Sequence, residues 1–340
     1  MPEPLLEIRD LRVSFRTEAG LVRAVDGLSL SVDADDVVGV VGESGSGKTV
    51  SMMAVMRLIR DPNAIVEGEV LLRGRDLMAL PQSEMRAVRG AEIAMIFQDP
   101  MTALTPVYTV GWQIAEQLRA HRDLSRRQAK ERAVELLAEV GIPNPERRVG
   151  QYPHEFSGGM RQRVMIAMAL SCNPSLLIAD EPTTALDVTI QAQIVELINH
   201  LKDDFDSAVI FITHDLGVIA ETADEVAVMY AGQIVEQAPT DELFGQPEHP
   251  YTEALLGAIC RLDFDVTQPI AAIPGQPPLP QQLPSGCPFH PRCPYRFEPC
   301  ATERPPLQAP ASEAHLDACW LPWDKKVELG SQRAKKVAAA

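Results

Sequence analysis

Short apolar runs, separated by polar or glycine-rich breaks, make up the start of the chain. Residues 5–13 and 22–32 are β-like runs, and residues 37–41 are apolar without interruption. A continuous apolar run is typical of a strand buried on both faces. Residues 42–49 are rich in glycine, and the apolar residues 50–59 have the pattern of a helix. The pattern therefore predicts a strand, a glycine loop and a helix in that order.

The middle of the chain has a helical pattern. Ser125, with Gln128 three residues later, resembles a capping box at a helix start. One face of the predicted helix then carries Ala129, Ala133, Leu136, Leu137 and Val140. Gly141 follows and stops the helix.

Alternation of strands and helices resumes after residue 174. Residues 175–179 and 208–213 are predicted strands, and residues 190–201 a helix. Such alternation predicts a mostly parallel sheet with helices on both faces, interrupted by the helical insertion.

Composition changes from about residue 269. A proline-rich stretch leads into a segment with four of the six cysteines. We therefore expect a nucleotide-binding domain over residues 1–268, with a helical subdomain at about 99–160. A separate Pro/Cys-rich module over residues 269–324 and a disordered tail over 325–340 are expected to follow.

The charge and the absence of export signals limit the function. Lys and Arg total 31 against 47 Asp and Glu, a formal charge of −16. Such an acidic surface argues against broad contact with nucleic acid. The first ten residues do not have the pattern of a signal peptide, and no membrane span is visible. We therefore expect a cytoplasmic protein whose cysteines are thiols or metal ligands.

The glycine loop has the pattern that holds nucleotide phosphates. Glycines let successive N–H groups point inward at an anion. The lysine supplies a charge for the β- and γ-phosphates of ATP, and the threonine hydroxyl suits a Mg²⁺ ligand. The loop residues expected to contact the nucleotide are Gly42, Ser44, Gly45, Gly47, Lys48 and Thr49.

Two acids end the apolar run of residues 176–179. Asp180 is expected to stabilise the Mg²⁺ shell, and Glu181 to polarise the attacking water as general base. A strand that merely ends in solvated acids is the alternative, and it is less favoured after a phosphate-binding loop.

Residues 156–162 carry a motif that narrows the family. Ser157, Gly158 and Gly159 match the signature of ATP-binding-cassette (ABC) ATPases, although Phe156 and Met160 depart from its usual form. The chain thus resembles the nucleotide-binding subunit of an ABC transporter. The resemblance implies two subunits paired head to tail, each lending this signature to the other's ATP.

Other positions match the same family. Gln98 matches the glutamine that reaches Mg²⁺ and water, Asp187 the loop that crosses the dimer interface, and His214 the histidine at the γ-phosphate. Phe15 is the expected adenine-stacking aromatic, with core packing as the alternative. The resemblance implies an α/β P-loop fold: a RecA-like, mostly parallel core sheet, an antiparallel β subdomain, an α-helical subdomain and a small Cys-rich extension.

Segments outside these motifs indicate the cargo. Residues 249–256 and 286–294, with 97–102 and 183–189, resemble dipeptide and oligopeptide importer ATPases, most closely the dipeptide branch. The resemblance implies a bacterial importer. Its partners would be a second, non-identical ATPase, two membrane permease subunits and a periplasmic or lipoprotein peptide-binding protein. The chain would lie on the cytoplasmic face of the inner membrane. Nickel importers are near relatives, and a non-transport ABC ATPase is a remote alternative.

Four clustered cysteines, Cys287, Cys293, Cys300 and Cys319, suggest metal. Their gaps exceed the spacing common at zinc sites. Thiolate ligation from irregular loops suits a [4Fe–4S] cluster, which the resemblance also implies. Zinc with His290 or His315 and metal-free thiols remain alternatives. Cys172 and Cys260 are expected to be small core residues, and the cysteine module is expected to be separate from the ATP site.

Overall fold

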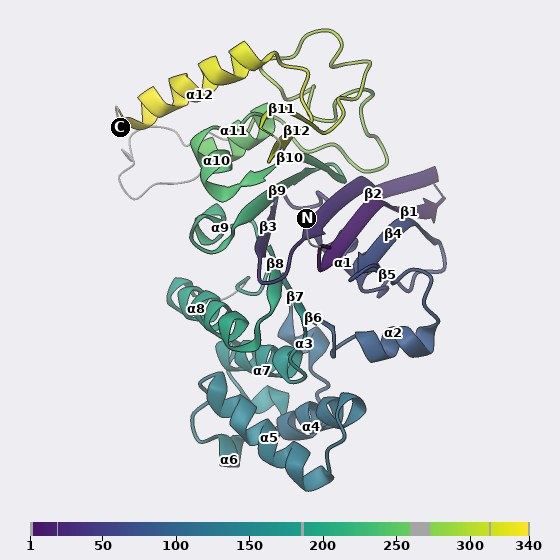
Figure 1. Cartoon of the computed structure of the whole chain (residues 1–340), viewed down its shortest axis with the longest axis vertical. Coiled ribbons are helices and arrows are strands. Elements are labelled where there is room, and N and C mark those ends of the chain that lie inside the picture. The colour runs from purple at the N-terminus through teal and green to yellow at the C-terminus, as the bar shows by residue number, and fades with distance from the viewer. Residues whose placement is uncertain (1–2, 19, 185–186, 259–272, 313, 339–340) are drawn as a thin grey trace. The chain divides into compact units, whose positions relative to one another are not determined.

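The computed structural model describes residues 3–18, 20–184, 187–258, 273–312 and 314–338 (Figure 1). The chain forms two compact units. Unit 1 contains Met1–Leu6, Val32–Val37 and Leu71–Ile212. Unit 2 contains Glu7–Ser31, Val38–Val70 and Thr213–Ala340.

The sheet strands of unit 1 are parallel and fully buried. They are β6 (Ile93–Ile96), β7 (Leu176–Asp180) and β8 (Ala208–Ile212), in the order β8-β7-β6. Ile96 pairs with Ala179, and Asp180 pairs with Ile212. The carboxyl ends of the three strands therefore meet at one edge. The strands over residues 175–179 and 208–213 were predicted from the sequence, whereas β6 was not. A short strand, β5 (Arg75–Asp76), pairs antiparallel with the end of β4 (Ala64–Leu72).

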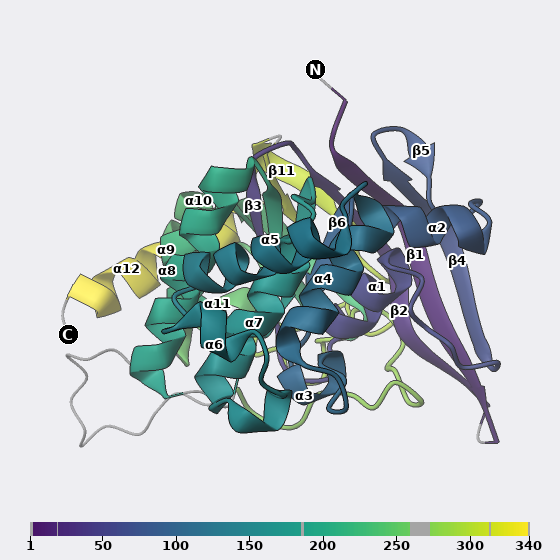
Figure 2. The ribbon, with the colours of Figure 1, turned by 90° about the horizontal axis from the view of Figure 1, so that it is seen from below.

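Helices form most of the rest of unit 1. They are α2 (Gln82–Val88), α3 (Pro100–Ala103), α4 (Val110–His121), α5 (Arg126–Glu139), α6 (Pro145–Arg148), α7 (Gly158–Leu170) and α8 (Val188–Phe205), with a 3-10 turn, η1 (Pro153–Glu155). Figure 2 shows α4 and α5 close together, and both also contact α7. The capping box at Ser125 and Gln128 is confirmed. The expected apolar face is confirmed as well, because Ala129, Ala133 and Leu136 are buried.

Unit 2 contains the other strands. β9 (Glu225–Tyr230) pairs parallel with β3 (Val37–Val41) and antiparallel with β10 (Gln233–Pro239). β12 (His315–Asp317) adds antiparallel to β10, and β11 (Gln308–Ser312) adds to β12. A second sheet places β1 (Leu6–Thr17) between β2 (Gly20–Val32) and β4. The segment after residue 272 thus supplies two strands, β11 and β12, to the sheet that contains β3, β9 and β10. The sequence did not predict these two strands.

The helices of unit 2 are α1 (Lys48–Val55), α9 (Leu216–Thr222), α10 (Thr240–Gly245), α11 (Pro250–Gly257) and α12 (Trp323–Ala338). The predicted helix over residues 50–59 is shorter than expected at its end. Arg57 adopts φ +50°, a left-handed conformation that ends the helix. No helix in the described part of the chain is both long enough and apolar enough to span a membrane.

The expectation of a disordered tail from residue 325 is wrong at its start. α12 occupies this region, and its Lys326 side chain is only 2% exposed. Lys326 Nζ lies 2.6 Å from Asp317 Oδ2 on β12, whose side chain is fully buried. This pair fixes the start of the helix to the sheet. The sequence around Lys326, WDKKVELG, gives no signal for such a long-range contact.

Candidate functional site

The glycine loop joins β3 to α1 in unit 2. All five residues of β3 are buried, and α1 begins at Lys48. A Cβ on Gly42 would clash with the Met229 carbonyl oxygen. At Gly47, where φ is +105°, a Cβ would lie 2.5 Å from the Ala24 carbonyl oxygen. Glycine is therefore required at both ends of the loop, because any side chain would displace neighbouring backbone.

Lys48 and Ser46 give the loop its anion-binding character. Lys48 is 6% exposed, and its Nζ donates to the carbonyl oxygens of Gly42 (2.7 Å) and Glu43 (3.1 Å). The Ser46 hydroxyl is buried and has no hydrogen-bond partner within the described residues. Ser44 and Gly45 are exposed at the tip of the loop. A lysine and an unpaired hydroxyl beside a helix start fit a phosphate group.

Neighbouring elements of unit 2 support the loop. The Gly232 N–H donates to the Ser46 carbonyl oxygen at 2.9 Å. The Glu43 N–H donates to the Tyr251 hydroxyl at 2.8 Å. Burial raises the pKa of Tyr251 above its ordinary value, so its hydroxyl stays protonated at neutral pH.

Phe15 and His214 also belong to unit 2. Phe15 is partly exposed near the end of β1, and His214 is exposed between β8 and α9. Asp215 follows His214 and caps α9, accepting from the Gly217 N–H at 2.9 Å.

The two acids lie at the carboxyl end of β7 in unit 1. Asp180, the last residue of β7, is 2% exposed. Glu181 has a left-handed φ of +44°, and its N–H donates to the Ile212 carbonyl oxygen at 2.8 Å. Backbone strain of this kind persists only where the surrounding structure holds it, and it is common at functional residues.

Two side chains hold the Glu181 carboxylate. Gln98 Nε2 donates to Glu181 Oε2 at 3.0 Å, and the Thr184 hydroxyl donates to the same oxygen at 2.8 Å. Because β6 and β7 are parallel neighbours, Gln98 and Glu181 follow adjacent strand ends. The sequence predicted both residues but missed Thr184, whose only signal is a hydroxyl three positions after the glutamate.

The signature residues begin α7. Ser157 is its N-cap, with Oγ accepting from the Met160 N–H at 3.4 Å. Gly158 is exposed, and a Cβ on Gly159 would lie 3.0 Å from Ile190 Cγ2. Asp187 is the exposed N-cap of α8. Residues 185 and 186 of the predicted interface loop lie outside the described residues.

Four cysteines of the C-terminal segment (residues 273–322) line a common pocket. They are Cys287, Cys293, Cys300 and Cys319. Burial raises the pKa of Cys293 to about 11 and that of Cys319 to about 12. Among the described residues, no three or more His, Cys, Asp or Glu side chains form a group that could hold a metal ion. The predicted metal site is therefore not supported. Cys172 is buried, as predicted, and Cys260 lies outside the described residues.

The expectation that this segment is separate from the ATP site is wrong. Arg292 forms two hydrogen bonds with Glu43, the second residue of the glycine loop: Nη1–Oε2 at 2.6 Å and Nη2–Oε1 at 3.0 Å. The two residues are 249 positions apart in the sequence, so no local pattern could predict the contact.

Comparison with known proteins agrees with the geometry. Residues 25–184 match the family "ABC transporter", and residues 235–300 match "Oligopeptide/dipeptide transporter, C-terminal region". Oligopeptide transport ATP-binding protein OppD of Bacillus subtilis (strain 168) is 53% identical, with 93% of this chain and 88% of the relative covered. Dipeptide transport ATP-binding protein DppD of the same organism is 49% identical, with 94% and 95% covered.

A solved structure has the same fold over much of the chain. It is the dimeric, post-hydrolysis state of the ATP-binding cassette MJ0796 bound to ADP and Pi, with TM-score 0.62 and 25% identity. The similarity covers 69% of this chain and 98% of that one. With a phosphate-binding loop, a glutamate held after β7 and these similarities, the chain belongs to the ABC transporter ATPases of the oligopeptide/dipeptide family.

Proposed function

We propose that the chain is the ATP-hydrolysing subunit of a bacterial importer for dipeptides and oligopeptides. The observation that carries this proposal is the Glu181 carboxylate, held by Gln98 and Thr184 directly after the buried Asp180. The family match and the names of the relatives support peptides as cargo. Identities to the oligopeptide and dipeptide relatives are similar, so both lengths of peptide are included.

Each residue of the proposed site has a role in hydrolysis. Lys48 and the loop N–H groups would bind the phosphates, and Phe15 would stack on adenine. Glu181 would accept the proton of the attacking water, while Gln98 keeps its carboxylate in place and His214 contacts the γ-phosphate. The proposed Mg²⁺ ligands are Thr49 in unit 2, and Gln98 and Asp180 in unit 1. Mg²⁺ would neutralise charge on the β- and γ-phosphates.

A second ATPase subunit would complete each site. Ser157, Gly158 and Gly159 start a helix of 13 residues, whose N-terminal dipole favours an anion. We propose that they contact the ATP bound by the partner, and that Asp187 lies at that interface. The dimeric state of the solved relative supports this arrangement. A non-identical partner is an inference from the importer family.

An apolar surface of unit 1 is the proposed contact with a membrane subunit. Tyr108 and Trp112 stack at 4.0 Å between ring centroids, although each is nearly half exposed. Met101 and Val107 beside them in sequence are 42% and 70% exposed. Large apolar side chains in such a group favour protein contact. This surface would place the chain at the cytoplasmic face of the inner membrane.

The cysteine-lined pocket is the proposed site of a [4Fe–4S] cluster in a small Cys-rich module. A zinc ion needs four donors at about 2.3 Å from one centre. In a [4Fe–4S] cluster each thiolate binds a different iron, so the sulfurs stand farther apart. The four cysteines that line one pocket are the thiolates that would hold the proposed cluster. The cluster would hold the irregular loops of residues 286–300 together, a structural role.

Reconstitution tests the proposed function. The chain would be purified with its second ATPase and two membrane subunits, placed in lipid vesicles, and supplied with binding protein and ATP. We expect peptide accumulation and peptide-stimulated ATP hydrolysis, both lost in Glu181→Gln. Transport of Ni²⁺ without peptide transport would favour the nickel-importer alternative instead. ATP hydrolysis that no membrane subunit or solute alters would favour a non-transport ATPase.

A further inference from the structure

Arg292 connects the C-terminal segment to the glycine loop. Its guanidinium forms two hydrogen bonds with the Glu43 carboxylate, a paired geometry that fixes orientation as well as distance. The Arg292 side chain is only 5% exposed, and that of Glu43 is 25% exposed. The pair is therefore sheltered from water, where charged hydrogen bonds are stronger than at an open surface.

Neighbouring groups fix Arg292 in this position. Its Nε donates to the Pro274 carbonyl oxygen at 2.9 Å, and its Nη1 also donates to the Tyr230 hydroxyl at 3.3 Å. Its guanidinium carbon lies 5.8 Å from the ring centres of both Tyr230 and Phe289. Burial lowers the pKa of Arg292, but its interactions with Glu43 and Tyr230 together outweigh burial and raise the pKa above its ordinary value.

Glu43 links Arg292 to Lys48 and Ser46, the loop residues proposed to bind phosphate. Its side chain is held by Arg292, and its N–H by the Tyr251 hydroxyl. Its carbonyl oxygen accepts from Lys48 Nζ at 3.1 Å and from the Ser46 N–H at 3.2 Å. The three polar parts of Glu43 are thus fixed together, so its position sets those of Lys48 and Ser46.

We propose that Arg292 is a positioning residue for the phosphate-binding loop, so that tight ATP binding requires the C-terminal segment. Glu43, Tyr230 and Pro274 take up four of the five N–H donors of Arg292, so its proposed action on the nucleotide is through Glu43. It acts by keeping the loop in one conformation before ATP arrives. If the loop had to become ordered when ATP binds, the free energy of ordering would be subtracted from the binding free energy, and ATP would bind more weakly.

The same contact makes the loop sensitive to the cysteine-lined pocket. Arg292 immediately precedes Cys293, and Phe289, which also lines the pocket, lies 5.4 Å from the rings of both Tyr230 and Tyr251. A rearrangement of the pocket therefore moves the residues on either side of Arg292. The state of the thiols is expected to alter nucleotide affinity through this route.

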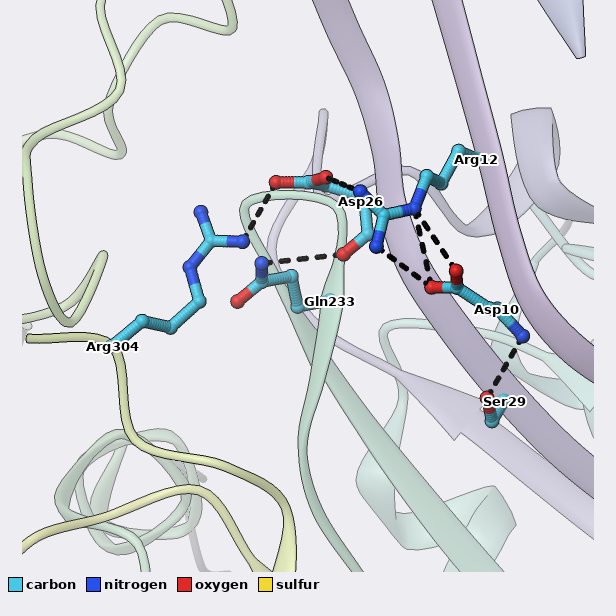
Figure 3. Close-up of polar contacts among 6 residues, drawn as sticks. All are labelled: Asp10, Arg12, Asp26, Ser29, Gln233 and Arg304. Atoms are coloured by element: carbon cyan, nitrogen blue, oxygen red, sulfur yellow. Dashed lines mark hydrogen bonds and ion pairs between the residues drawn. The ribbon is translucent and has the colours of Figure 1, made fainter. Parts of the chain in front are cut away.

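A second connection keeps the segment attached when Arg292 is changed. Arg304 Nη1 lies 2.7 Å from Asp26 Oδ2, and Figure 3 shows the Asp26 carboxylate between Arg304 and Arg12. The Asp26 N–H donates to the Gly232 carbonyl oxygen at 2.8 Å. Since Arg304 would remain in place, loss of Arg292 releases the loop without detaching the whole segment.

The test uses the full chain and the equilibrium binding of N-methylanthraniloyl-ATP with Mg²⁺. We expect Arg292→Ala and Glu43→Ala each to raise Kd about tenfold, which corresponds to about 1.4 kcal/mol. The double variant should be no weaker than either single one, because both remove the same interaction. Arg296→Ala is the matched control, since Arg296 is exposed in the same segment.

Conservative variants distinguish a role in positioning the phosphate-binding loop from a general loss of fold stability. Tyr251→Phe removes only the hydroxyl that holds the Glu43 N–H, and Arg292→Lys keeps the charge but not the paired geometry. Each should weaken binding severalfold while the thermal unfolding midpoint stays near that of Arg296→Ala. Kd values within twofold of wild type in both, or additive effects in the Arg292–Glu43 cycle, would overturn the proposal.

Discussion

Replacing Glu248 by glutamine should remove a pH dependence from the stability of unit 2. Glu248 is 4% exposed and lies near Asp317, whose other oxygen pairs with Lys326. Glu248 Oε2 and Asp317 Oδ1 have no other hydrogen-bond partner among the described residues. One proton shared between these two oxygens would satisfy both. Burial, and then the bond to Asp317, raise the pKa of Glu248 from 4.5 to about 7.

The raised pKa of Glu248 determines the sign and the size of its contribution to the free energy of unfolding at each pH. An acid whose folded-state pKa is raised stabilises the fold below its unfolded pKa, and the stabilisation is lost as pH rises through the folded value. Each pKa unit corresponds to about 1.4 kcal/mol, so a rise from 4.5 to about 7 corresponds to about 3 kcal/mol at most. Between about pH 5.5 and pH 8 the loss is about 2 kcal/mol.

Glutamine can donate to Asp317 at every pH, because its amide mimics the protonated acid. Urea unfolding of wild type and Glu248→Gln, measured from about pH 5.5 to pH 8, should therefore diverge by about 2 kcal/mol in favour of the variant. Burial lowers the pKa of His249 to about 3, below the measured range. Burial also lowers the pKa of His315, but the Glu236, Glu248 and Glu242 carboxylates together outweigh it and raise that pKa. Because Glu248 Oε1 lies 3.5 Å from His315 Nδ1, the titration of His315 is followed separately by NMR in both proteins, and its contribution is subtracted. Glu298→Gln, at an exposed glutamate, is the control. A difference that stays constant with pH would refute the shared proton.

Three further predictions concern the nucleotide site. Glu181→Gln should reduce ATP turnover at least about 100-fold without weakening ATP binding, because only the general base is lost; gel filtration with ATP should then show a trapped dimer, and near-normal turnover would contradict the role. Ser157→Arg should disable the site whose glycine loop belongs to the partner subunit. It should therefore abolish the turnover that remains when this chain carries Lys48→Ala, and it should leave turnover unchanged when the partner's glycine loop is inactivated instead; loss in the second pairing alone would contradict the head-to-tail arrangement. Cys293→Ser should remove the proposed iron, expected at about four per chain, and weaken nucleotide binding through Arg292; stoichiometric zinc without iron in anaerobic wild-type protein would contradict the cluster.

Local patterns were enough to predict the parts of the site that depend on neighbouring residues. A buried strand followed by glycines and Lys48 predicts the phosphate loop, since the backbone conformation demands glycine at Gly42 and Gly47. Asp180 and Glu181 follow from an apolar strand that ends in acids. The capping box at Ser125 was predictable for the same reason, because its hydrogen bonds span only three residues.

Contacts between distant residues could not be predicted in this way. No sequence rule selects Arg292 as the partner of Glu43. The different composition of the C-terminal segment also favoured the wrong prediction of an independent module. The start of α12 was missed because Lys326 is buried by its pairing with Asp317, not by apolar periodicity. Thr184 was missed because a hydroxyl near an acid is common in turns.

Peptide uptake by the reconstituted transporter tests the central claim most directly. Vesicles holding the chain, its partner ATPase and two membrane subunits would receive ATP, binding protein and a radiolabelled dipeptide or oligopeptide. We predict accumulation of the peptide that requires ATP and is abolished by Glu181→Gln in this chain. Equal uptake with wild type and Glu181→Gln, or ATP hydrolysis without any peptide uptake, would contradict the account.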